Sequence, residues 1–160
     1  DWRAPAGVFA LGDAFGDALL SPAPDWPMQE VTPRTLWVED ASSPDYNRLV
    51  VIPGEDPLSE WQEGQRMRLG DDAHRLKLVV EHNTAPPLPG AGSAIFFHIW
   101  RRDGTRPTAG CTALPAEEME GLIRWLSPTA EPVYVLLPAP AYTALSEAWG
   151  LPEGAGESGR

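Results

Sequence analysis

Eighteen prolines and fifteen glycines are spread through a chain of only 160 residues. Proline lacks the N–H that regular helices and central strands use, and glycine favours turns, so both residues divide the chain into short segments. Many short segments joined by turns favour strands over a bundle of long helices. The sequence therefore predicts a mixed, β-rich fold.

The apolar runs between these turn residues give the expected elements. A helix is expected after Pro115, because Glu117 and Glu118 suit the positive end of its dipole and an apolar stripe runs from Met119 to Leu126. Residues 75–82 alternate between apolar and charged side chains, which is typical of a half-buried strand. The other expected elements are strands in residues 1–16, 35–38, 48–52, 94–100 and 132–137, a surface loop over 17–34, and short helices over 56–67 and 140–149.

Length and charge limit the classes of protein. A chain of 160 residues with 42% apolar content is expected to form one domain, residues 1–150, followed by a disordered tail over 151–160. The net charge of −11 argues against nucleic acid or an anionic membrane as a partner. No apolar run reaches the 18 residues of a membrane span. One cysteine and three scattered histidines give no metal-ligand spacing, so neither a metal nor another cofactor is expected.

The stretch from residue 92 to 114 carries the chemistry. It contains the only cysteine, Cys111, directly after Gly110, and His98 near the end of an apolar strand. A turn between the two segments would bring the imidazole beside the thiol, where it lowers the thiol pKa and moves its proton. Gly110 lets the backbone approach a substrate and aim its N–H groups at an oxyanion.

Two structural interpretations compete with catalysis. A lone cysteine is often a small buried apolar residue, and a histidine in an apolar strand is often a hydrogen-bonded core residue. A Cys/His pair alone does not identify a protein family.

The motif Thr108-Ala109-Gly110-Cys111, preceded by the strand histidine His98, resembles the L,D-transpeptidase catalytic domain of the YkuD type. That family pairs a histidine with Ser/Thr-His-Gly-Cys and a nearby arginine. This chain departs from the pattern at Ala109 and Ala113, so it resembles a divergent, single-domain branch. Residues 5–9 are similar to the segment near the start of that domain, and the resemblance covers most of residues 1–140.

The resemblance has further implications for fold and location. It implies a β-sandwich or mixed sheet with one main helix after Cys111, in a chain that lacks the first strands of the domain. It also implies a monomer in the periplasm or cell envelope, whose leader is absent from this chain.

The activity that the resemblance implies is acyl transfer in peptidoglycan synthesis. Cys111 attacks an L–D peptide bond of a donor stem peptide, His98 moves the proton, and D-alanine leaves before a second stem accepts the acyl group. Water as acceptor gives an L,D-carboxypeptidase, and a non-catalytic wall-binding domain is the alternative class. Carbapenems are expected to acylate Cys111.

The substrate-binding residues are expected near the motif. Because stem peptides carry carboxylates, Arg102 and Arg101 are the candidate cations in place of the arginine that the family has at position 113. The other candidates, on the resemblance alone, are Thr108, Ala109, Trp100, Tyr46, Asn47 and Asn83.

Overall fold

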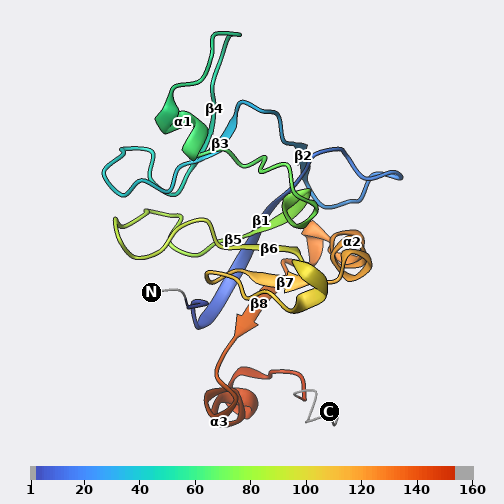
Figure 1. Cartoon of the computed structure of the whole chain (residues 1–160). Helices are drawn as coiled ribbons and strands as arrows, with labels where there is room; N and C mark the ends of the chain where they lie inside the picture. Colours follow the sequence, from blue (N-terminus) through green and yellow to red (C-terminus); the bar gives the residue numbers. More distant parts are fainter. Residues whose placement is uncertain (1–2, 154–160) are drawn as a thin grey trace.

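The computed structural model describes residues 3–153 (Figure 1). Eight strands and three α-helices alternate with three short 3₁₀ turns along these residues. The strands are β1 (Gly7–Gly16), β2 (Met28–Glu30), β3 (Thr35–Trp37), β4 (Leu49–Val51), β5 (Leu76–Val80), β6 (Phe96–Ile99), β7 (Thr112–Leu114) and β8 (Val133–Leu136). The helical segments are α1 (Glu60–Gly64), η1 (Asp72–His74), η2 (Arg102–Gly104), α2 (Ala116–Trp125), η3 (Pro128–Ala130) and α3 (Ala139–Trp149).

A mixed six-stranded sheet forms the centre of the molecule, with five strands in the order β2-β1-β5-β6-β7 and the sixth, β8, paired with β1. The long strand β1 pairs with β8 through its first half, and with β2 and β5 through its second half. Strands β6 and β7 are parallel, with Phe97 opposite Thr112 and His98 opposite Ala113. Strands β3 and β4 form a separate antiparallel pair. The expected mixed, β-rich fold is confirmed.

Helix α2 covers one face of the sheet. Met119 and Ile123 are completely buried there, against Leu78 and Phe97 of β5 and β6. Burying an aliphatic side chain of this size contributes roughly 1.5–3 kcal/mol. The main helix after Cys111 is therefore present, although β7 lies between the cysteine and the helix.

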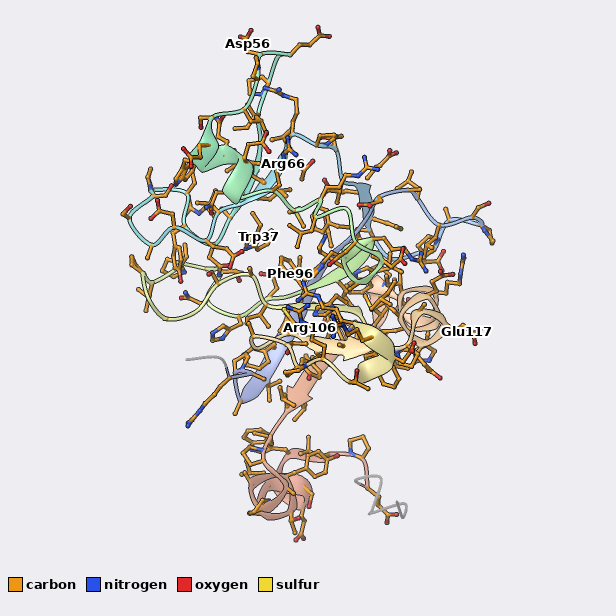
Figure 2. All side chains as sticks on the ribbon, in the orientation of Figure 1. Trp37, Asp56, Arg66, Phe96, Arg106 and Glu117 are labelled. Carbon is orange, nitrogen blue, oxygen red and sulfur yellow. The ribbon has the colours of Figure 1, made fainter. Side chains whose placement is uncertain are left out.

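The β3–β4 pair and its loops lie over the opposite face (Figure 1). Val79 and Phe96 point to this face because they alternate with the residues that contact α2. Trp37 of β3 meets Phe96 edge to face, with ring centroids 5.1 Å apart (Figure 2). Apolar layers therefore cover both faces of the sheet. The side chain of His98 points to the face covered by the β3–β4 pair, opposite to that of Phe97, as the alternation along the strand predicts.

Three expectations about the elements were wrong. The expected loop over 17–34 contains β2, whose Met28-Gln29-Glu30 lacks an apolar alternation but pairs in parallel with β1. The helix expected over 56–67 is only α1, because Ser59 rather than Asp56 caps it, in a capping box with Gln62. Strand β5 is buried on both faces, since β3 and its neighbours cover the face that carries Lys77.

The C-terminal helix α3 ends at Gly150, whose φ of 61° forms a left-handed cap. The hydroxyl of Tyr142 then donates a 2.6 Å hydrogen bond to the carbonyl of Pro152. Residues 154–160, most of the tail expected to be disordered, lie outside the described residues. Within residues 3–153, no helix is both long and apolar enough to cross a membrane.

Candidate active site

Cys111 and His98 line one cavity of about 220 Å³, here called the Cys111 cavity. The β6–β7 register places Cys111 next to Phe96, one residue before β7 begins. Phe96 and His98 are two residues apart, so their side chains lie on the same face of the sheet. The parallel pairing of β6 and β7 thus brings together two side chains that are 13 positions apart in the chain.

The thiol of Cys111 is held by backbone groups. Its sulfur lies 3.4 Å from the N–H of Phe96, which donates to it, and 3.4 Å from the carbonyl oxygen of Ala94, to which the S–H donates. Burial raises the pKa of the Cys111 thiol, and the Phe96 N–H opposes this effect. Burial thus favours the neutral thiol, whereas the sequence analysis expected a neighbouring imidazole to lower the thiol pKa.

The ring of His98 has a defined tautomer. Its Nδ1 lies 2.7 Å from the carbonyl oxygen of Ile99, which can only accept, so Nδ1 carries the hydrogen and Nε2 is the basic nitrogen. Only 4% of the residue is exposed, and burial lowers the pKa of His98. No hydrogen bond joins His98 to Cys111 among the residues that the structure describes. They share a cavity in which burial favours the neutral form of both groups.

A second histidine, His74, stacks on His98 with ring centroids 4.9 Å apart and an angle of 33° between the planes. The Nδ1 of His74 donates a 2.6 Å hydrogen bond to Asp71, and the guanidinium of Arg101 lies 3.2 Å from its Nε2. Burial lowers the pKa of His74 despite the carboxylate of Asp71. His74 and Asp71 were not identified from the sequence, where only their i, i+3 spacing was visible.

Lys77 is a buried cation in the same cavity. It lies opposite His98 in the β5–β6 ladder, and its Nζ donates 2.6 Å hydrogen bonds to the carbonyls of Met67 and His74. Burial lowers the pKa of Lys77 to about 8. The sequence analysis placed its charge on an exposed face, so this residue was also missed.

Position 110 requires a glycine, because the backbone of Arg3 passes close to it. The φ of Gly110 is +139°, and a Cβ at this position would lie 2.8 Å from the carbonyl oxygen of Arg3. Its N–H donates to the hydroxyl of Thr108, which in turn donates to the carbonyl of Cys111 at 2.7 Å. Thr108 thereby fixes the turn that presents the cysteine.

Asn47 and Asn83 lie outside the Cys111 cavity and connect loops through side-chain hydrogen bonds. The side chain of Asn47 accepts from the Trp37 indole and from the N–H of Ala94, and it donates to the carbonyl oxygens of His82 and Asn83. The Asn83 amide donates to the carbonyls of residues 88 and 92. Tyr46 is buried beside them, with 5% exposed. Substrate contact by these residues stays a prediction.

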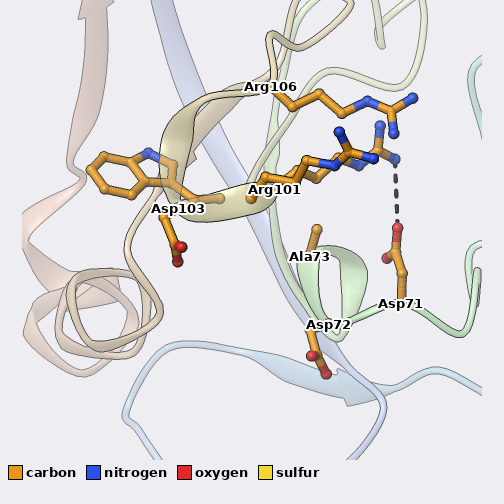
Figure 3. A pocket seen from close by; sticks show the side chains of 8 residues that line it. Asp71, Asp72, Ala73, Arg101, Asp103 and Arg106 are labelled. Carbon is orange, nitrogen blue, oxygen red and sulfur yellow. Dashed lines mark ion pairs between the residues drawn. The ribbon is translucent and has the colours of Figure 1, made fainter.

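Two larger cavities adjoin the Cys111 cavity. One, of about 480 Å³, runs along residues 90–93 and shares Ala109 with it; we call this the loop cavity. The other, of about 510 Å³, shares Arg101 with it; this is the arginine cavity. The arginine cavity is lined by Asp71, Asp72, Ala73, Trp100, Arg101, Arg102, Asp103 and Arg106 (Figure 3).

The residues expected to bind substrate are distributed over these cavities. Thr108 and Ala109 line the Cys111 cavity, and Arg102 and Trp100 line the arginine cavity. Among residues 3–153, no group of three or more His, Cys, Asp or Glu side chains is arranged to hold a metal ion.

A family model, the L,D-transpeptidase catalytic domain (YkuD), matches residues 1–135. The match includes both Cys111 and His98 and all strands of the central sheet, apart from the last residue of β8. No curated protein and no solved structure gave a significant match.

Proposed function

The chain belongs to the family of L,D-transpeptidase catalytic domains, and we propose that it transfers acyl groups of peptidoglycan stem peptides through a thioester on Cys111. The family acts on peptidoglycan, and its members are typically cysteine-dependent transpeptidases. One observation carries the proposal for this chain. Cys111 shares a cavity with His98, whose Nε2 is left free to take a proton by the bond from Nδ1 to the Ile99 carbonyl.

In the first half-reaction, the sulfur of Cys111 attacks the carbonyl carbon of an L–D peptide bond. Nε2 of His98 takes the thiol proton as the C–S bond forms. The backbone N–H of Cys111, on the turn fixed by Gly110, donates to the oxyanion. The C–N bond then breaks, and the same proton passes from His98 to the amine of the leaving D-alanine.

In the second half-reaction, an amine of a second stem attacks the thioester. His98 takes a proton from that amine, the C–S bond breaks, and the thiolate recovers the proton. The free thiol and the neutral imidazole are thereby restored. The substrate of this cycle lies in the cell envelope, so we propose the periplasm or the envelope as the location, and a monomer as the acting unit.

Two other functions follow from particular observations. Water could enter through either adjoining cavity and hydrolyse the thioester, which would make the protein an L,D-carboxypeptidase. The raised pKa of Cys111 favours the other alternative, a wall-binding domain in which the cysteine only packs.

Incubation with a purified disaccharide-tetrapeptide, followed by mass spectrometry, separates these functions. A transpeptidase gives a crosslinked dimer and free D-alanine, and a carboxypeptidase gives the tripeptide form and D-alanine. Cys111→Ala is the control and should give neither. Unchanged substrate with the wild-type protein would refute both enzymatic functions.

A further inference from the structure

The arginine cavity concentrates positive charge in an acidic protein. The chain has only 12 lysines and arginines against 23 acidic residues, yet three arginines, at 101, 102 and 106, line this one cavity. The Arg101 and Arg106 guanidiniums extend in the same direction from the linker between β6 and β7 (Figure 3). Such a cluster is suited to a carboxylate ligand.

The aspartates at the cavity do not neutralise all three arginines. Asp71 is 3.6 Å from the Arg101 guanidinium and also accepts from His74, so these groups satisfy one another. The carboxylates of Asp72 and Asp103 point away from the Arg101 and Arg106 guanidiniums (Figure 3). Within residues 3–153, no ion pair or hydrogen bond engages the guanidinium of Arg102 or Arg106.

The linker that carries these arginines has a defined conformation. Arg102 and Asp103 have φ values of 48° and 51°, in the left-handed region that side chains with a Cβ rarely adopt. The indole N–H of Trp100 donates a 2.8 Å hydrogen bond to the carbonyl of Ala113. Gly104 packs so closely on this indole that a Cβ would lie 3.0 Å from it. The arginines are thus presented by a linker anchored on β7, in the cavity that shares Arg101 with the Cys111 cavity.

We propose that Arg102 and Arg106 bind the carboxylate adjacent to the reacting amine, for both the leaving group and the acceptor. This inference rests on the proposed function. The leaving amine and the attacking amine occupy the same position relative to the sulfur, because both half-reactions pass through tetrahedral centres of the same kind. The leaving D-alanine carries a carboxylate on its amine-bearing carbon. A cation site that accepts this group also selects acceptors of the same chemistry, which are amino acid centres with a free carboxylate.

Competition between two acceptors for one acyl-enzyme tests this subsite. The protein is incubated with a tetrapeptide donor and equal concentrations of ¹³C-labelled D-alanine and D-alaninamide, and the two exchange products are measured by mass spectrometry. The product ratio is independent of the rate of acylation, since both acceptors react with the same thioester. The wild type should prefer labelled D-alanine.

The double variant Arg102→Gln/Arg106→Gln should lower this preference about tenfold, the effect of losing a charge-assisted contact. Arg48→Gln, an exposed arginine of another loop, is the matched control and should keep the wild-type ratio. Glutamine removes the positive charge but keeps a polar side chain with a Cβ, so the substitution places no new steric demand on the backbone at position 102.

An unchanged ratio in the double variant, or a wild type without preference for the carboxylate, would overturn the inference and leave the proposed function intact. No exchange product from the wild type with either acceptor would overturn the proposed transferase function, and this inference with it.

Discussion

Replacing Lys77 by methionine should change how the stability of the protein depends on pH. Lys77 is 3% exposed, and its pKa falls to about 8 from an ordinary 10.5. Its folded-state pKa lies below its unfolded-state pKa, so the unfolded chain binds more protons between these values. The free energy of unfolding of the wild type should therefore rise with pH from about 8 to 10.5, as the cost of burying the ammonium disappears.

The difference of 2.5 pKa units between 10.5 and about 8 corresponds to a burial cost of about 3 kcal/mol at neutral pH. Lys77→Met removes this cost but leaves the carbonyls of Met67 and His74 without their donor, at about 1–3 kcal/mol each. These effects oppose one another, so we expect a small net change at pH 7. The wild type should gain about 2–3 kcal/mol relative to the variant between pH 7 and pH 10.

Urea unfolding of both proteins at pH 7, 8, 9 and 10 measures this difference. Other titrating groups contribute to both curves, and their effects largely cancel in the comparison. Parallel curves for the two proteins would refute the reasoning, because they would mean that the ammonium of Lys77 is solvated. Such a result would also remove Lys77 as a buried cation beside Cys111 and His98.

Three further predictions concern the site and its supports. The value of kcat/KM should fall below pH 6.5, because burial lowers the pKa of His98, and should fall again above pH 9.0, because burial raises the pKa of Cys111. Complete alkylation of the thiol within seconds at pH 7 would contradict this profile. Asn47→Ala should lower the free energy of unfolding by roughly 2–4 kcal/mol in urea titrations, since it leaves buried partners unpaired, whereas a loss below 1 kcal/mol would show that water replaces the amide. Gly110→Ala should abolish D-alanine release in a mass-spectrometric assay, because its Cβ meets the Arg3 carbonyl. The control Gly64→Ala, which has open space around it, should keep full activity. Equal activity of the two variants would refute the close approach.

The sequence was sufficient for the elements that have a clear apolar pattern. The helix with Met119 was predicted because its buried stripe follows the helix period, and the strands around Trp37 and Val50 were predicted from short apolar runs between turn residues. Strand β2 was missed because its pairing with β1 depends on a distant segment. Lys77 was assigned to solvent because local alternation does not reveal that a second layer covers that face.

The candidate site was predictable only where a motif marked it. Cys111 and His98 were proposed from the motif around Gly110, and they line one cavity. His74 and Asp71 were missed because the turn η1 reaches His98 through the tertiary fold, from 24 or more positions away. The sequence predicted that His98 lowers the pKa of the Cys111 thiol, whereas burial raises it, because the pKa of a thiol depends on its burial, which a spacing does not give.

The central claim, a thioester on Cys111, can be measured directly. The wild-type protein is mixed with a tetrapeptide donor, quenched in acid and digested. Mass spectrometry then measures the mass of the peptide that contains the only cysteine. The account predicts that this peptide gains the mass of the donor minus D-alanine, and that the adduct is absent in Cys111→Ala and forms far more slowly in His98→Gln. Turnover of the donor without any adduct on Cys111, or an adduct that forms at the wild-type rate in His98→Gln, would contradict it.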